Sequence, residues 1–162
     1  MGIITAPEPI DSAHHLDGFD CGVPVLNEWL KRQALPNEIS GASRTFVACT
    51  DRRVIGFYAL ATGSVRRSEA PGKIKRRMPE PIPVMVLGRL AVDLSWQRKG
   101  VGLGLLKDAI LRTSTVSKQA GIRALVAHAL SEEAKNFYLS QGFQKSPLNQ
   151  MTVMLGITDW SL

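Results

Sequence analysis

The apolar and polar residues of the N-terminal half follow two different periods. Apolar residues recur at helical spacing over residues 24–33, directly after a proline that suits the first turn of a helix, and we predict an amphipathic helix there. Two β-branched and aromatic runs follow at residues 44–50 and 54–62. The short polar link between them predicts an antiparallel hairpin.

The C-terminal half alternates between strand and helix patterns. We predict, in order, a strand over residues 83–94, a helix over 102–118, a strand over 124–129, a helix between Ser131 and Gly142, and a strand over 150–155. Gly88 lies inside the first of these strands, where glycine is typical of a bulge. The order of elements predicts an α/β fold with a mixed sheet.

Length and composition narrow the class of protein. The chain has 162 residues, which predicts a single domain over residues 1–162. With 44% hydrophobic and 21% charged residues, it is far from the composition of a disordered chain. We see no apolar run of the roughly 20 residues that a membrane-spanning helix needs, and no basic and apolar leader at the N-terminus. We therefore expect a cytoplasmic protein without a membrane partner.

The positive charge is concentrated in one stretch. Residues 66–77, called here the basic segment, hold six cations and one anion, whereas the whole chain carries a net charge of +6. Pro71 and Gly72 interrupt the segment and three prolines follow it, so it is expected to project as a connection. Two interpretations stay open on charge alone: a binding surface for a polyanion, and a solvated loop that keeps the protein soluble.

Cysteines and histidines give no sign of a metal or a nucleophile. Cys21 and Cys49 are expected to be reduced thiols, because two cysteines alone cannot form a zinc site and neither follows a basic helix start. His14, His15 and His128 lie without clustered acids, so we expect structural roles for them. The sequence therefore predicts no metal.

The strongest local motif lies between the predicted strand 83–94 and the helix that follows. Residues 97–104, called here the glycine turn, read Gln-Arg-Lys-Gly-Val-Gly-Leu-Gly. Glycines at this position allow a tight turn whose N–H groups face outward, and the next helix adds its positive end, so a diphosphate is the expected ligand. No Gly-Lys-Ser/Thr follows, which argues against a P-loop, and no acidic residue ends the next strand, which argues against a dinucleotide fingerprint.

The glycine turn resembles motif A of the GNAT superfamily of acetyl-CoA-dependent N-acetyltransferases, with Gln97, Gly100 and Gly102 at the motif positions. The stretch 134–143 is similar to a second family block, although that block's first Asn is replaced by Ser131. The resemblance implies a mostly antiparallel mixed sheet flanked by helices, with a bulged central strand. It also implies acetyl-CoA as the cofactor, contacted by Leu90, Ala91, Val92, Gln97, Arg98, Lys99, Gly100, Val101, Gly102, Gly104 and Asn136.

Attack of an amine on an acetyl thioester needs N–H donors for the oxyanion and a proton donor for the thiolate. Residues 90–92, next to the expected bulge, can offer the N–H groups. Periodicity alone favours Tyr138 as a packed core aromatic, whereas the resemblance implies that it is the general acid. No general base stands out: Asp93 and Asp108 look like surface residues, and the acids after Ser131 look like helix-start residues. A missing base favours an α-amine, whose pKa is about 7.7 to 8.0, over a lysine.

Several further segments resemble the TacT-type GNAT toxins of bacterial toxin–antitoxin pairs, among them residues 5–9, 43–47, 56–65, 78–84 and 89–93. This resemblance implies acetylation of the α-amine of aminoacyl-tRNA, arrest of translation, a ribbon-helix-helix antitoxin and a homodimer. By analogy it places on the RNA path Arg66, Arg67, Lys73, Lys75, Arg76, Arg77 and Arg89.

Two other hypotheses remain open. The same enzyme class can act on a small-molecule amine or a protein N-terminus, with the basic segment serving solubility. The third hypothesis is a non-enzymatic module that binds CoA or nucleic acid through a degenerate acetyltransferase scaffold. It ranks last because the motif positions are filled.

Overall fold

The computed structural model describes residues 2–159, and its contacts divide the chain into two compact units. The first unit holds the residues up to Ala61 together with Gly88–Ala109. The second holds Thr62–Leu87 together with the residues from Ile110 onward. The single domain over residues 1–162 stays a prediction.

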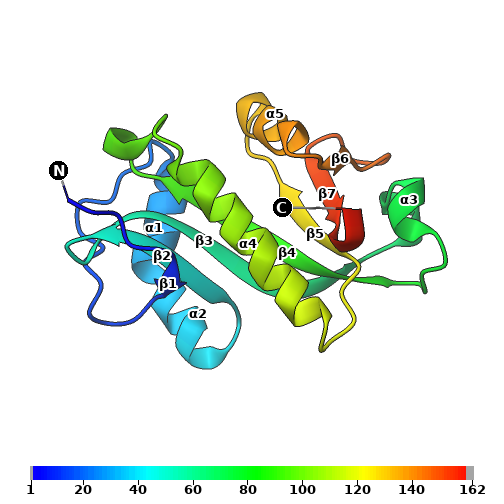
Figure 1. Ribbon diagram of the computed structural model, residues 1–162, viewed down its shortest axis with the longest axis horizontal. Helices are drawn as coiled ribbons and strands as arrows, with labels where there is room; N and C mark the ends of the chain where they lie inside the picture. The colour runs from blue at the N-terminus through cyan, green and yellow to red at the C-terminus, as the bar shows by residue number, and fades with distance from the viewer. Residues whose placement is uncertain (1, 160–162) are drawn as a thin grey trace. The chain divides into compact units, whose positions relative to one another are not determined.

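The elements follow the predicted order (Figure 1). The helices are α1 (Pro24–Arg32), α2 (Ala34–Ser40), α3 (Gly72–Lys75), α4 (Val101–Ser117) and α5 (Glu132–Ser140). The strands are β1 (Glu8–Pro9), β2 (Arg44–Thr50), β3 (Arg53–Val65), β4 (Ile82–Val92), β5 (Ala124–His128), β6 (Gln144–Lys145) and β7 (Thr152–Gly156). Within residues 2–159, none of the helices is long and apolar enough to span a bilayer.

The strands form one sheet in the order β1-β2-β3-β4-β5-β7-β6. The pairings of β2 with β1 and β3 are antiparallel, as are those of β7 with β5 and β6, whereas β4 and β5 run parallel. The expectation of a mixed, mostly antiparallel sheet flanked by helices is therefore confirmed. A register shift occurs at Ala48/Cys49 in β2. The bulge at Gly88 stays a prediction.

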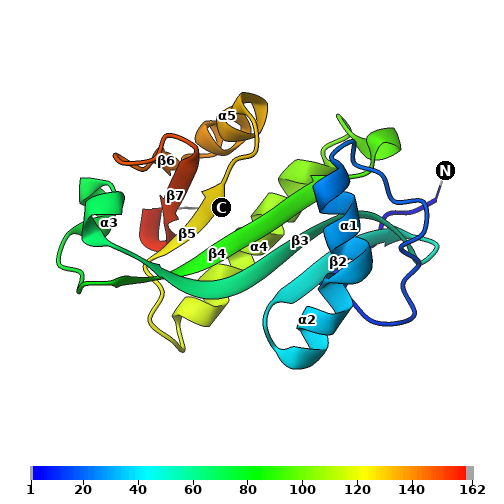
Figure 2. The same cartoon turned by 180° about the vertical axis from the view of Figure 1, so that it is seen from behind.

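In the first unit, helices cover both faces of the strands. Figure 1 shows the start of α4 in front of β3, and Figure 2, seen from behind, shows α1 and α2 over β2 and β3. The core behind the strands includes Leu30 and Ala34 from the helices and Val47 and Phe57 from the strands, all fully buried. On the other side, a Cβ at Gly56 would lie 3.0 Å from a Leu105 methyl group, so a glycine lets α4 approach closely.

The second unit has a separate core. It includes Ala70 and Ile74 from the basic segment, and Val84, Val126 and Met154 from β4, β5 and β7. The basic segment is therefore a connection, as predicted, but a folded one that contributes apolar side chains to a core. It contains a 3-10 turn at Arg67–Glu69 and the short helix α3.

The predictions are wrong at several places along the chain. The strand predicted to reach Leu94 ends at Val92, because Leu94 begins a 3-10 turn capped by the Asp93 carboxylate. Helix α2 was not predicted; Pro36 lies in its first turn, where the missing N–H is tolerated. Strands β1 and β6 have two residues each, too few to show a period.

Candidate active site

The glycine turn in the first unit leaves backbone N–H groups open at the start of α4. The N–H of Gly104 donates to the carbonyl of Gly100 at 3.1 Å, which is the first hydrogen bond of the helix. The N–H groups of the preceding residues, from Gly100 to Leu103, therefore have no partner within the helix. They lie at the positive end of a helix of 17 residues, a favourable place for an anion.

The backbone of the turn is accessible at its exposed glycines. Arg98 has φ +63° and Gly100 has φ +85°, so left-handed residues flank Lys99. Both Gly100 and Gly104 are exposed, and a Cβ at either would meet nothing within 4 Å. A diphosphate group can thus approach the N–H groups directly, without a side chain in between. The residues present fit the pyrophosphate of acetyl-CoA.

The end of β4 offers a second set of N–H groups in the same unit. The N–H of Asp93 donates to Ile55 of β3 at 2.8 Å. Because N–H groups alternate in direction along a strand, those of Leu90 and Val92 point away from β3. The described pairing of β4 with β5 extends only from Val84 to Leu87. Within residues 2–159, the outward N–H groups of Leu90 and Val92 thus lie past the last β5 pair.

The side chains predicted to contact the cofactor have different roles. Gln97 donates through its side-chain amide to the carbonyls of Val92 at 2.9 Å and Cys21 at 3.1 Å, so it fastens the turn to the strand. The ammonium of Lys99 lies 5.1 Å from the centre of the Trp96 ring. Arg98 and Asn136 are exposed, whereas the side chain of Ala91 belongs to the first core.

Asp93 corrects an expectation. It was predicted at the surface, but only 9% of it is exposed. Its carboxylate accepts hydrogen bonds from the N–H and hydroxyl of Ser95 and from the N–H of Asp20, at 2.6 to 3.0 Å. Burial raises the pKa of Asp93, but these hydrogen bonds outweigh it and the net pKa lies below its ordinary value. The Asp93 carboxylate therefore shapes the approach to the glycine turn, and its lowered pKa makes it a weak proton acceptor.

Tyr138 is held on α5 in the second unit. Ser131 caps this helix by accepting the N–H of Ala134 at 3.0 Å, which confirms the predicted cap. The Tyr138 ring centre lies 5.4 Å from that of Phe137 and 5.3 Å from that of Phe143, and the residue is 7% exposed. Burial raises the pKa of Tyr138 to about 12, so the phenol keeps its proton at neutral pH. Both sequence interpretations fit: Tyr138 is a packed aromatic, and it holds a proton.

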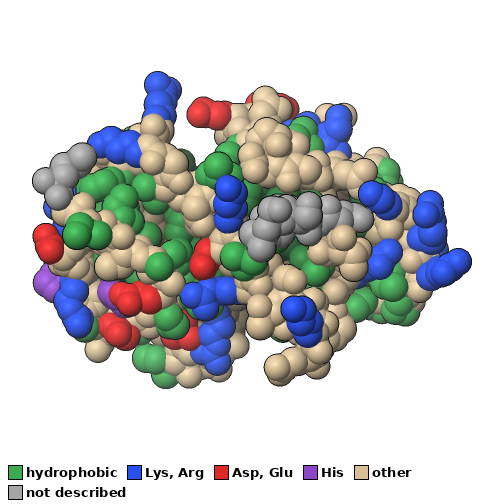
Figure 3. All heavy atoms as spheres, viewed as in Figure 1, with side chains coloured by type: hydrophobic (Ala, Val, Ile, Leu, Met, Phe, Trp, Pro, Cys, Tyr) green, Lys and Arg blue, Asp and Glu red, His purple; other side chains and the backbone are tan. Residues whose placement is uncertain are grey.

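The basic segment divides into internal and exposed cations. The guanidinium of Arg67 donates to the carbonyls of Lys75 and Met78 at 2.5 and 2.6 Å, so this side chain closes the segment on itself. Arg66 forms an ion pair with Glu69 at 3.3 Å. Arg76 and Arg77 are exposed, and within residues 2–159 neither side chain makes an ion pair or hydrogen bond. Figure 3 shows Lys and Arg side chains gathered around α3.

Two further cations, Arg89 and Arg123, make contacts within the fold, and the predicted RNA path stays a prediction. Arg89 belongs to the first unit, where its guanidinium lies 4.6 Å from the centre of the Trp29 ring, and burial lowers its pKa. Arg123 was not predicted. It donates to the carbonyls of Lys73 and Ile74 at 3.0 Å and so supports the C-terminal end of α3. No motif marks Arg123, because its role depends on tertiary contacts with a segment about 50 residues earlier in the chain.

The comparisons with known proteins agree with this arrangement. The model of the acetyltransferase (GNAT) domain matches residues 41–145. The chain is 45% identical over 159 residues to a tRNA-acetylating toxin of Mycobacterium tuberculosis, covering 98% of this chain and 96% of that protein. It is 29% identical to a probable toxin TacT of Sinorhizobium fredii, covering 93% and 90% of the two chains.

Solved structures are similar over nearly the whole chain. AtaT complexed with acetyl-methionyl-tRNAfMet has a TM-score of 0.89 and 29% identity, with 96% of each chain covered. A tyrosine-to-phenylalanine mutant of KacT has a TM-score of 0.90 and 29% identity, with 96% and 95% covered. AtaTR bound with AcCoA has a TM-score of 0.83 and 31% identity, with 96% and 94% covered.

Proposed function

This chain belongs to the GNAT acetyltransferase family, and we propose that it is a toxin that transfers the acetyl group of acetyl-CoA to the α-amino group of an aminoacyl-tRNA. One observation carries the proposal. The exposed backbone at the glycine turn and the outward N–H groups at the end of β4 form the anion and oxyanion donors that acetyl transfer requires, in a chain 45% identical to a tRNA-acetylating toxin.

The first unit supplies the binding groups. Acetyl-CoA, when bound, provides an activated acetyl thioester. The N–H groups from Gly100 to Leu103 bind its pyrophosphate, and Gln97 holds the turn against β4 while they do so. The N–H of Leu90 donates to the carbonyl oxygen of the acetyl group. As the amine attacks and negative charge develops on that oxygen, this N–H stabilises it.

Tyr138 supplies the proton that the departing thiolate takes up. Because its pKa is about 12, the phenol is protonated at every physiological pH and so carries the proton that this step uses. The phenolate that forms is buried and unfavourable, so it takes up a proton from solvent. The amine attacks in its neutral form, and the proton that its nitrogen loses after the C–N bond has formed goes to water. No carboxylate is needed as a base, because an α-amine with a pKa of about 7.7 to 8.0 is partly neutral at pH 7.

The basic segment binds the tRNA phosphates in this proposal. The exposed side chains of Arg76 and Arg77 are available, and Lys73 is exposed on the same segment. Arg67 contributes indirectly, because it shapes the segment through backbone carbonyls. Contacts of this kind position the tRNA without reading its sequence. The similar structure of AtaT complexed with acetyl-methionyl-tRNAfMet supports a charged tRNA as the substrate.

We extend the proposal to partners. Solved structures similar to this chain include AtaT bound to the C-terminus of the antitoxin AtaR and a KacTA–DNA complex. We therefore propose a cognate antitoxin of the ribbon-helix-helix type, a homodimeric toxin, and action in the cytoplasm.

The experiment compares the wild type with Tyr138→Phe on mixed aminoacyl-tRNA and isotopically labelled acetyl-CoA. Loss of the proton donor is expected to lower kcat by about 100- to 10,000-fold with little change in the KM for acetyl-CoA. Tyr58→Phe is the control, since the Tyr58 hydroxyl donates to Asp108 within the first unit. The proposal fails if the wild type labels no charged tRNA. Labelling of a free amine or a protein N-terminus in place of tRNA would show the other substrate class.

A further inference from the structure

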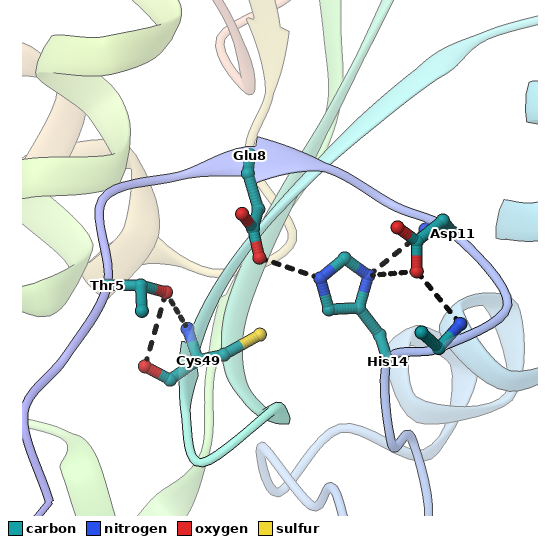
Figure 4. A network of polar contacts seen from close by, with 6 residues as sticks. Thr5, Glu8, Asp11, His14 and Cys49 are labelled. Atoms are coloured by element: carbon teal, nitrogen blue, oxygen red, sulfur yellow. Dashed lines mark hydrogen bonds and ion pairs between the residues drawn. The ribbon is translucent and has the colours of Figure 1, made fainter.

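Three side chains that can bind a metal come together in the first unit, outside the acetyl-transfer groups. Glu8 lies on β1, His14 in the loop that follows β1, and Cys49 on β2. A carboxylate oxygen of Glu8, a ring nitrogen of His14 and the sulfur of Cys49 all lie within 4.8 Å of one another. Figure 4 shows these side chains turned toward a common point. We call them the N-terminal cluster.

Two members of the N-terminal cluster are buried. The His14 side chain is 4% exposed and Cys49 is 1% exposed, whereas the Glu8 side chain is 52% exposed. Within residues 2–159, the Cys49 thiol makes no hydrogen bond. The backbone N–H of Cys49 donates to the Thr5 hydroxyl, and its carbonyl accepts from the Thr5 hydroxyl and the Thr5 N–H. A buried thiol is thus held next to an imidazole and a half-exposed carboxylate without using its lone pairs.

Asp11 allows the His14 ring to carry its proton on either nitrogen. The backbone N–H of Asp11 donates to Nδ1 of His14 at 3.0 Å, and the Nε2 atom lies 2.8 Å from the Glu8 carboxylate. In this arrangement the proton is on Nε2. An Asp11 carboxylate oxygen also lies 3.4 Å from Nδ1, so it can accept a hydrogen bond from a protonated Nδ1 if Nε2 becomes a ligand. Carboxylates behind a ligating histidine are a common feature of metal sites.

We propose that the N-terminal cluster binds a zinc ion through Glu8, His14 and Cys49, with water as the fourth ligand. Sulfur, imidazole and carboxylate together suit Zn²⁺, whereas Mg²⁺ and Ca²⁺ prefer oxygen ligands alone. Zinc ligands in a tetrahedral site lie roughly 3.5 Å apart, so the atoms of the cluster need to move by only about 1 Å. On binding, Cys49 releases its thiol proton to solvent. The His14 proton passes from Nε2 to Nδ1, which breaks the hydrogen bond from the Asp11 N–H and forms one from Nδ1 to the Asp11 carboxylate.

The zinc ion would fasten the N-terminal segment to the edge of the sheet. Strand β1 has two residues and one of them is Pro9, so few backbone hydrogen bonds hold it to β2. A metal that joins Glu8 and His14 to Cys49 adds a cross-link at this edge, and its binding free energy adds to the stability of the fold. This role does not depend on acetyl transfer.

The test uses the full chain stripped of metal with a chelator and titrated with Zn²⁺ against a chromophoric competitor. We expect one zinc ion per chain in the wild type. Cys49→Ala and Glu8→Gln should each weaken binding by at least about 100-fold, and Asp11→Asn by about 10- to 100-fold. Cys21→Ala is the matched control, because Cys21 is also buried but bonds through its sulfur to the Val23 carbonyl; it should bind zinc as the wild type does.

A second measurement begins with the wild type alone. Co²⁺ bound by the wild type should show a thiolate charge-transfer band in the near ultraviolet, and Zn²⁺ should raise the Tm. Both effects should persist in Cys21→Ala and vanish in Cys49→Ala. The proposal is overturned if the wild type takes up no zinc, if Co²⁺ binds without that band, or if Cys49→Ala binds zinc as tightly as the wild type.

Discussion

The glycine turn and the basic segment are both suited to binding phosphate, but their hydrogen-bond donors come from different parts of the chain. In the glycine turn the donors are backbone N–H groups that have no partner within the helix, and the glycines at positions 100 and 104 leave space for a ligand to reach them. In the basic segment the donors are side chains, and the fold uses one of them, Arg67, for its own carbonyls. Sequence spacing therefore identifies a phosphate site built from backbone N–H groups. For a site built from side chains, the tertiary contacts are needed to tell which cations are exposed.

The largest effect that we expect from this comparison is a loss of stability when Arg67 of the basic segment is replaced. Arg67→Ala removes two hydrogen bonds from a charged donor to the carbonyls of Lys75 and Met78. We expect the free energy of unfolding to fall by about 2 to 4 kcal/mol. Arg66→Ala is the matched control, because its exposed ion pair with Glu69 is worth about 0 to 1 kcal/mol. Urea unfolding measures both, and equal stabilities for the two variants would contradict the division into internal and exposed cations.

The next largest effect is on the KM for acetyl-CoA and tests the backbone N–H groups of the glycine turn. Gly104→Glu places a carboxylate beside the open N–H groups, where it repels a diphosphate, while a Cβ there has free space and an acid in the first turn favours the helix. We expect the KM for acetyl-CoA to rise by about 10- to 100-fold without loss of stability. Gly104→Gln has the same size without the charge and should raise KM much less. Equal KM values for the two variants would show that size, and not charge, decides.

The sequence predicted well the elements that carry a strong local signal. Pro24 at the start of α1 and the Ser131 cap of α5 both lie where the pattern placed them. The glycine turn lies between β4 and α4, as its spacing required. Each of these depends on backbone preferences within a few residues, which a sequence displays directly.

Features that depend on distant contacts were not predicted. Asp93 looked like a surface acid, but its carboxylate joins Asp20 to Ser95 inside the first unit. Arg67 is predicted on the RNA path, and nothing in the sequence indicates that its guanidinium donates to the carbonyls of Lys75 and Met78. The N-terminal cluster joins Glu8 and His14 to Cys49 only because β1 pairs with β2, and no spacing along the chain marks it. Charged side chains of the same type can have a structural role or lie exposed at the surface, and only the packing of the folded chain shows which of the two applies.

A smaller effect concerns the exposed arginines of the basic segment. Arg76→Ala and Arg77→Ala should each weaken binding of aminoacyl-tRNA by a few-fold and similarly for every tRNA, since phosphate contacts carry no sequence information. Each change should also lower the slope of log K against log salt by about 0.7 to 1. KM for tRNA at several salt concentrations measures this. An unchanged slope in both variants would assign the segment to solubility and leave the glycine turn as the only phosphate site of the pair.

The smallest effect concerns how the glycine turn is held at low pH. Hydrogen bonds from Ser95 and Asp20 hold the pKa of Asp93 below its ordinary value, against the opposing effect of burial. A lowered pKa in the folded state contributes stability at pH values above the unfolded pKa of about 3.9, and this contribution is lost as the pH falls through the folded pKa. Asp93→Asn removes the titrating group, so its disadvantage relative to the wild type should be greatest near neutral pH and shrink below about pH 4. Urea unfolding at several pH values measures the difference, with Asp17→Asn at an exposed position as the control. A disadvantage that stays constant across this range would mean that the carboxylate holds the turn by shape alone and that its charge contributes nothing.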